Sequence, residues 1–433
     1  MFNREQMLHF FWLIFFLALP FSKWLSTASE LALVAFTLYK FNWSSFKQNL
    51  YAYRHVAFLM LFFGCLLLGL LYTDNLSNGL RVIRHQHRFL VIPLLFLANA
   101  HLVRKNIAIY ASVFVMAATA SGLVVAVLYW LPEHVTRNLA NNLGIMRDYP
   151  DMHLRAAFGL YSPFIERIQL SSLIAIAILT AIYLVSVNYK KWLHLVLLAF
   201  MFYVMLILGG RGGQVSLMGA LLLYASFISV RFIFPVLQKK LGTTGATTVI
   251  ILAFVAVFAG VPWAAYKTMP SVQDRINQTR WELELINNGR FVEHDYNNFT
   301  TLRRIVSWQN MWTLVKRNPV FGTGTGDYYQ ELENVYAEGP VQVMINSHSQ
   351  YLMIWAMTGI LGLVVFVGSL VYWLYSLRRP TLLFYYAAAF FIFYILNMSF
   401  DAVLFTQVDS MAFSAFFSLI GLLKPLNSAP KHA

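Results

Sequence analysis

The sequence predicts an all-α, polytopic integral membrane protein with about twelve transmembrane helices and one large helical loop outside the bilayer. Hydrophobic residues make up 59% of the 433 residues and charged residues only 12%, whereas soluble domains carry roughly 25% charged residues. Apolar runs long enough to cross a hydrocarbon core, about 17 to 25 residues each, recur along the whole chain. We therefore expect one membrane domain to take up nearly all of the chain.

Polar and charged breaks divide the apolar sequence into twelve predicted helices. The first run begins near Met7 and has no A-x-A cleavage signature after it, so we interpret it as a retained helix and not as a signal peptide. Three regions result: residues 1–265 with nine helices, a large loop at 266–349, and residues 350–433 with three helices and a C-terminal tail. The predicted helices cover residues 8–24, 27–42, 56–72, 89–103, 107–131, 168–187, 193–210, 213–233, 247–265, 350–375, 381–399 and 402–423.

The charge distribution predicts which loops face the cytoplasm. Lys and Arg outnumber Asp and Glu by 32 to 18, a formal charge of +14. Cytoplasmic loops of membrane proteins collect Lys and Arg, so this charge needs no nucleic-acid partner and we expect none. With a cytoplasmic N-terminus every inner segment is basic, and the long loops 132–167 and 266–349 lie outside. The inner basic residues are Lys40, Lys47, Arg54, Arg104, Lys105, Lys190, Lys191, Arg231, Lys239, Lys240, Arg378, Arg379, Lys424 and Lys431.

Several kinds of site are missing from the sequence. Cys65 is the only cysteine and lies in an apolar run, so no intramolecular disulfide can form. The sequence has no HExxH motif and no Cys cluster, and the first outside loop, around Ser26 to Ser29, holds no carboxylate pair for a divalent ion. We expect no metal and no cofactor, so arginine would have to meet the negative charge of a leaving group.

One predicted outside segment is basic. Arg81, Arg84, His85 and Arg88 have the spacing i, i+3, i+4 and i+7, which places all four on one face of an α-helix. Long basic side chains can reach lipid headgroups without forming a site. Arginine also pairs with phosphate through two parallel hydrogen bonds, so the cluster alternatively predicts a groove for a phosphate-bearing lipid.

A second basic position lies in a tight turn between two apolar helices. Arg211 stands within the sequence Gly-Gly-Arg-Gly-Gly-Gln that ends at Gln214. The glycines allow a sharp turn and the close approach of a bulky substrate, and an arginine at this depth is costly unless it is paired or hydrated. Asp401 or Asp409 would serve as structural partners, and a diphosphate is the alternative partner.

The large loop contains an amphipathic helical pattern from Asn298 to Arg317, with Arg303 and Arg304 in its first half and Asn318-Pro319 at its end. A glycine-rich run, Phe321 to Asp327, follows it. A nucleotide-binding fingerprint would need a strand before such a run and a helix after it. This context is missing, so we interpret the run as a tight bend.

His348 lies where the large loop re-enters the membrane, in the sequence Asn-Ser-His-Ser-Gln-Tyr that ends at Tyr351. Imidazole has an ordinary pKa of about 6.5, which suits proton transfer near neutral pH. A lone histidine is more often structural. Because arginines are predicted on the same side of the membrane, we favour a role for His348 as a general base.

These motifs together resemble the O-antigen ligase and polymerase superfamily of bacterial envelope glycosyltransferases. The resemblance rests on the Gly-Gly-Arg-Gly turn at Arg211, the Arg-x-x-x-Trp pattern of Arg304 and Trp308 with Asn-Pro-x-x-Gly-x-Gly after it, and Asn-x-His-x-x-Tyr-Leu through His348. It covers roughly residues 195–410, and the rest of the chain matches only in its helical character. Ser349 departs from the pattern, because many members have Asn directly after the histidine.

The resemblance implies a GT-C-like membrane enzyme of the bacterial inner membrane that acts on the periplasmic side without metal or nucleotide. Such an enzyme passes polysaccharide from undecaprenyl diphosphate to the lipid A-core oligosaccharide with inversion. In this reading His348 is the general base, and Arg211 and Arg304 stabilise the diphosphate. Asp401 orients the histidine or an arginine. The remaining predicted contacts to the diphosphate come from Arg81, Arg84, His85, Arg88 and Arg303.

Two other functions stay open at this point. A polymerase that extends lipid-linked repeats would share the motifs and differ only in its acceptor. A transporter of anionic lipids or sugars would explain the basic outer groove, but transporters usually show paired repeats with interrupted helices, and the sequence has no evident repeat.

Overall fold

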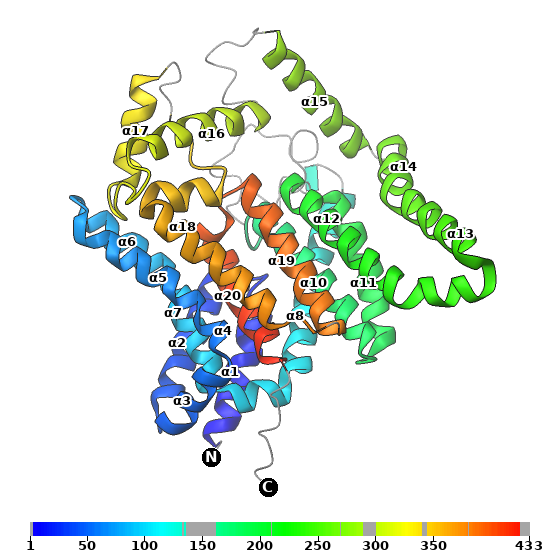
Figure 1. Cartoon of the computed structure of the whole chain (residues 1–433), viewed down its shortest axis with the longest axis horizontal. Coiled ribbons are helices and arrows are strands. Elements are labelled where there is room, and N and C mark those ends of the chain that lie inside the picture. The colour runs from blue at the N-terminus through cyan, green and yellow to red at the C-terminus, as the bar shows by residue number, and fades with distance from the viewer. Residues whose placement is uncertain are drawn as a thin grey trace.

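Helices account for all regular secondary structure in the computed structural model, which describes residues 3–131, 134–135, 162–208, 210–268, 270–288, 300–339, 344–379 and 381–424. No strand occurs in these residues, so the predicted all-α class is confirmed. Figure 1 shows α15 (Pro270–Asn287), α16 (Thr300–Arg317) and α17 (Tyr328–Glu338) at one end of the helical bundle, and α3 (Trp43–Ala52) at the other.

Six stretches in the described part of the chain are helical, long and apolar enough to cross a membrane. This makes the chain a multi-pass membrane protein, and the total of twelve crossings stays a prediction. Two further apolar helices are shorter, Lys191–Ile207 and Gln407–Leu422. The six long stretches are Arg54–Tyr72, Ala100–Trp130, Arg167–Ser186, Gly212–Thr268, Gln350–Ser376 and Leu382–Phe400.

The N-terminal helices differ in their bounds from the predicted spans. The first helix, α1 (Arg4–Ala18), begins with a capping box in which Asn3 and Gln6 satisfy each other's backbone N–H groups. Local breaks divide the predicted span 56–72 into α4 (Arg54–Ala57), α5 (Leu59–Leu68) and the 3₁₀ helix η1 (Gly69–Tyr72). The other helices of this part are α2 (Lys23–Leu38), α6 (Leu76–Gln86), α7 (Arg88–Ala98) and the 31-residue α8 (Ala100–Trp130).

A glycine separates the eighth and ninth predicted spans. Gly242 has φ 71° and ψ 175°, which breaks the helical path inside α13 (Phe234–Val255). Glycine adopts this conformation without the steric cost that other residues meet. In Figure 1, α13 and α14 (Val261–Thr268) lie apart from the bundle. The neighbouring elements are α10 (Arg167–Ser186), α11 (Lys191–Ile207), α12 (Arg211–Ile228) and the π-helical turns η3 (Ser229–Ile233) and η4 (Ala256–Gly260).

The core of the bundle is built around α20 (Gln407–Leu422), which is buried from Val408 to its end. Its buried serines include Ser410, Ser414 and Ser418 at a spacing of four residues. Small residues on one face allow neighbouring helices to approach closely inside a membrane. Aromatic side chains join α20 to α18 (Gln350–Ser376) and α19 (Leu382–Phe400), whose ends carry the residues of the candidate site: Nε1 of Trp373 donates to the carbonyl of Phe417 at 3.0 Å, and Phe390 stacks on Phe413.

The glycine-rich run after α16, residues 321–327, packs against a break in α18 and forms hydrogen bonds with its backbone. Gly359 has φ 67°, and a Cβ atom there would lie 1.9 Å from the carbonyl oxygen of Val320, so only glycine fits. At this break the carbonyl oxygens of Ala356 and Met357 accept hydrogen bonds from the N–H groups of Thr323 and Gly324, at 2.7 and 3.2 Å. The run is therefore a tight bend, as predicted, and it fastens the large loop to α18.

Candidate active site

His348 and Asp401 face each other across the ends of two helices. His348 lies just before α18, and Asp401 ends α19 in an extended conformation. Nδ1 of His348 lies 3.5 Å from Oδ1 of Asp401, and the two side chains are 24% and 22% exposed. This separation is long for a hydrogen bond but within ion-pair range. Because Nδ1 faces the carboxylate, Nε2 is the nitrogen that can meet a substrate.

The backbone on either side of His348 is fastened to α16. The N–H of His348 donates to Oγ of Ser307 at 3.2 Å, and the carbonyl of His348 accepts from Nε1 of Trp308 at 2.9 Å. Ser307 in turn donates to the carbonyl of Asn346 at 3.1 Å. Ser307 is fully buried. These contacts hold the histidine in one position before any ligand arrives, which is what a catalytic group needs.

Arg303 and Arg304 lie one helical turn before the two residues that hold His348. The spacing i, i+4 places Arg303 on the face of Ser307, and Arg304 on the face of Trp308. Both arginines are partly buried. Nε of Arg303 is buried without a hydrogen-bond partner among the described residues, so a guanidinium donor is available near the histidine.

The turn that carries Arg211 is packed between two helices. Cβ atoms added at Gly210 and Gly213 would lie 2.6 and 2.4 Å from Ser171 in α10, so both positions require glycine. Gly212 lies against Phe400, which directly precedes Asp401. The backbone of Arg211 thus starts α12 beside the end of α19 that carries Asp401. The side chain of Arg211 lies outside the described residues. Its predicted partners, either Asp401 or Asp409 or a diphosphate, therefore stay predictions.

A buried polar network lies beside Asp401. Asp409 is fully buried and accepts a hydrogen bond from Oγ1 of Thr406 at 2.8 Å. Nearby, Nδ2 of Asn397 donates to Oγ of Ser172 at 3.0 Å. These contacts join α10, α19 and α20 at the end of the bundle where the candidate site lies. No three His, Cys, Asp or Glu side chains gather closely enough to hold a metal ion among the described residues.

The four basic residues predicted on one helix face are divided by the structure. α6 ends at Gln86 and α7 begins at Arg88, so Arg88 does not share a helix with the others. Arg81, Arg84 and His85 are exposed. Arg88 is buried, with Nε 3.7 Å from Oε2 of Glu30 on α2. The prediction of a single exposed face is wrong for Arg88, because Glu30 draws its guanidinium into the bundle.

The pKa values of His87 and His85 shift in opposite directions, because only His87 contacts Glu30. Nε2 of His87 lies 3.2 Å from Oε1 of Glu30, and this contact raises the pKa of His87 although burial opposes it. Partial burial lowers the pKa of His85, and the charges of the neighbouring arginines lower it further. The sequence analysis missed Glu30. A lone carboxylate inside an apolar run is costly in lipid unless it is paired, and this signal could have identified it.

One family model matches part of the chain. Residues 195–367 match the family model for the O-antigen ligase, about two fifths of the chain. The matched segment includes Arg211, Arg304 and His348, and it leaves out Asp401 and the basic residues of α6. No curated protein matches the chain.

Proposed function

Because residues 195–367 match the family model for the O-antigen ligase, we propose that this protein transfers polysaccharide from undecaprenyl diphosphate to the lipid A-core oligosaccharide. The reaction is an inverting, metal-independent glycosyl transfer at the periplasmic face of the bacterial inner membrane. The observation that carries the proposal is the partly exposed pair of His348 and Asp401, 3.5 Å apart.

His348 acts as the general base of this reaction. Nε2 takes the proton of the acceptor hydroxyl while the hydroxyl oxygen attacks the anomeric carbon of the donor sugar. The bond from that carbon to the diphosphate oxygen breaks, and undecaprenyl diphosphate leaves. Asp401 faces Nδ1, so it keeps the ring oriented and stabilises the imidazolium that forms.

The arginines stabilise the negative charge that builds up on the leaving diphosphate. Arg304 and Arg303 belong to α16, and the backbone of Arg211 begins α12. Arginine suits this role because its guanidinium pairs with two phosphate oxygens at once. Arg81, Arg84 and His85 are exposed on α6 and can position the diphosphate. Arg88, which the sequence grouped with them, stabilises the fold instead through Glu30.

A polymerase is the alternative, because the family includes enzymes that extend lipid-linked repeats. The two activities share the donor and the catalytic groups, and they differ only in whether the acceptor is lipid A-core or another lipid-linked repeat.

The test is transfer by purified protein in detergent, with undecaprenyl-diphosphate polysaccharide as donor and lipid A-core as acceptor, in EDTA and without nucleotide. We expect wild type and His101→Ala to form capped lipid A, and His348→Ala to form almost none. His101 is an exposed histidine on α8 and serves as the matched control. Lengthened donor glycans without capping would favour the polymerase. Loss of transfer in EDTA alone, or normal transfer by His348→Ala, would contradict the mechanism.

A further inference from the structure

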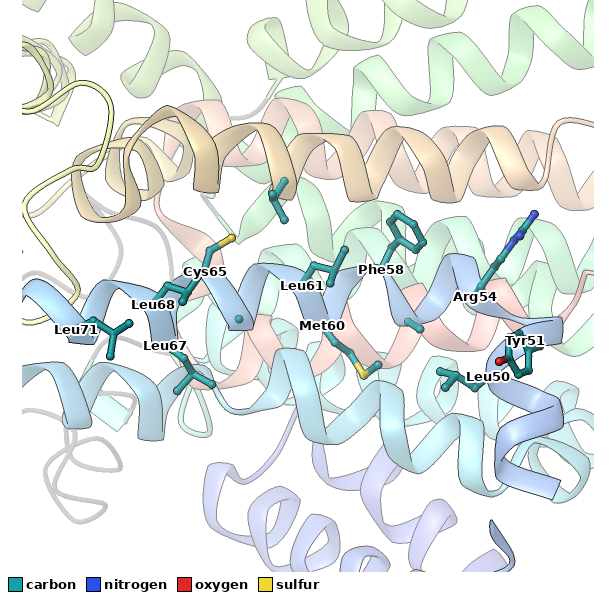
Figure 2. Close-up of a pocket in the computed structure, with 13 residues that line it drawn as sticks. Leu50, Tyr51, Arg54, Phe58, Met60, Leu61, Cys65, Leu67, Leu68 and Leu71 are labelled. Atoms are coloured by element: carbon teal, nitrogen blue, oxygen red, sulfur yellow. The ribbon is translucent and has the colours of Figure 1, made fainter. Parts of the chain in front are cut away.

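A long apolar groove runs along the outside of the bundle between α5 and α18. It has a volume of about 1020 Å³ and is lined mainly by leucine, with Phe58, Cys65 and Val365. Leu61 and Leu68 in the groove are 53% and 61% exposed. Figure 2 shows Leu71 at one end of the groove, and Arg54 and Tyr51 at the other. The groove is therefore apolar along its length and basic at one end.

A second, smaller pocket adjoins this basic end. Arg54 lines both cavities, and the second, of about 290 Å³, is also lined by Arg378, Arg379 and Lys424. No Asp or Glu is among the described residues that line either cavity. Burial, and then the charges of these three arginines, lower the pKa of Lys424. Four cations thus lie close enough to repel one another.

This basic pocket lies at the opposite end of the bundle from His348. His348 precedes α18 and Arg378 follows it. The part of α18 after its break at Gly359 is by itself about 25 Å long. The loops at this end are those that the positive-inside rule assigns to the cytoplasm. The pocket is thus far from the proposed glycosyl transfer and has no part in it.

We propose that the two cavities form a binding site for one anionic glycerophospholipid of the cytoplasmic leaflet, with its phosphate in the basic pocket and an acyl chain along Phe58 and Leu61. Basic pockets between transmembrane helices on the cytoplasmic side bind anionic lipid headgroups in this way. The phosphate offsets the mutual repulsion of the cations, and the chain covers exposed apolar surface. Arg54 links the two parts, because it lines both.

The basic half of the site is tested by removing two of its charges. Wild type and Arg54→Gln/Lys424→Gln are purified in detergent, mixed with phosphatidylglycerol or phosphatidylethanolamine, and examined by native mass spectrometry. We expect wild type to retain phosphatidylglycerol in preference to phosphatidylethanolamine, and the double variant to bind phosphatidylglycerol about twenty-five-fold more weakly, about fivefold for each charge. The control Lys239→Gln/Lys240→Gln removes two exposed charges outside both cavities and should bind as wild type does.

The apolar half is tested at Gly64, which lines the groove. A Cβ atom added there meets nothing within 4 Å, so the backbone leaves room for a side chain that starts at this position, and Gly64→Phe places an aromatic ring at the groove. Gly368 on α18 is equally open and does not line the groove, so Gly368→Phe is its control. We expect Gly64→Phe to reduce phosphatidylglycerol retention at least tenfold, as expected when an acyl chain loses its contact surface, and Gly368→Phe to leave it unchanged.

Four outcomes would overturn this inference: equal retention of the two phospholipids by wild type, undiminished binding by Arg54→Gln/Lys424→Gln, equal loss in the lysine control, or displacement of phosphatidylglycerol by equimolar polyprenyl phosphate. Arg54→Lys/Lys424→Arg keeps both charges, and its normal binding would show that charge and not misfolding explains the double variant. None of these readouts depends on glycosyl transfer, so failure of the proposed function leaves them interpretable.

Discussion

The His348–Asp401 pair and the Arg88–Glu30 pair join the same kinds of group, but they differ in exposure and therefore in what they can do. The side chains of the first pair are 24% and 22% exposed, at a contact of 3.5 Å. Those of the second are 5% and 2% exposed, at 3.7 Å. An open pair can meet a substrate, whereas a closed pair can only stabilise the fold. The two contact distances are nearly equal, so distance does not distinguish a catalytic pair from a structural one. The exposure of the side chains to solvent does.

Removal of His348 should give the largest effect on transfer. His348→Ala is expected to slow the reaction by about 10² to 10⁴, the usual contribution of a positioned general base. The melting temperature should stay that of wild type, because the histidine side chain has no short hydrogen bond. The two measurements are product formation and thermal unfolding of the same preparations. A large drop in melting temperature would mean that His348 stabilises the fold, as Arg88 and Glu30 do.

Neutralising Glu30 should produce the opposite pattern. Glu30→Gln leaves the charge of Arg88 buried without its partner, so the free energy of unfolding should fall by about 3–5 kcal/mol. The transfer rate per folded molecule should be retained. Denaturant titration in detergent measures the first quantity. Arg84→Gln, at an exposed position of α6, is the control and should change stability by less than about 0.5 kcal/mol. Equal loss in both variants would remove the distinction between the pairs.

Asp401→Asn tests what the carboxylate contributes to the His348–Asp401 pair. Loss of one preorganised electrostatic contact typically costs about 10² to 10³ in rate, and we expect the lower end because His348 keeps its backbone contacts to α16. Stability should change little. Transfer assays across a range of acceptor concentrations test whether the loss falls on kcat. A change in KM alone would make Asp401 a binding residue and not an orienting one.

The smallest effect concerns pH. Contact with Glu30 raises the pKa of His87 above its ordinary value of 6.5, so the protonated form is favoured in the folded protein. The stability from this contact is fully present below pH 6.5 and is lost as pH rises through the raised pKa. Wild type should therefore melt at a higher temperature than His87→Gln in acid, and the difference should shrink as pH rises. A difference independent of pH would mean that the contact is steric.

Local patterns predicted several elements closely. The amphipathic pattern over residues 298–317 corresponds to α16 at Thr300–Arg317, because a helical period is a property of one segment. The bend after it was recognised from the missing nucleotide-binding context. The breaks between α4, α5 and η1 inside the predicted span 56–72 were not predicted, because hydropathy marks apolar runs but not the points where a helix is interrupted. The positive φ of Gly242, 71°, is likewise not visible in composition.

The sequence by itself determined that the chain is helical and membrane-embedded, and which histidine and arginines to consider, because hydropathy, helical period and short motifs are local properties. Only the tertiary structure decided which charges meet. It placed Asp401 beside His348 and turned Arg88 inward to Glu30. The physical reason is that an ionic partner is supplied by another helix, and the choice among helices depends on how the whole bundle packs. Exposure, which separates the proposed catalytic pair from the buried pair of Arg88 and Glu30, is likewise a property of that packing.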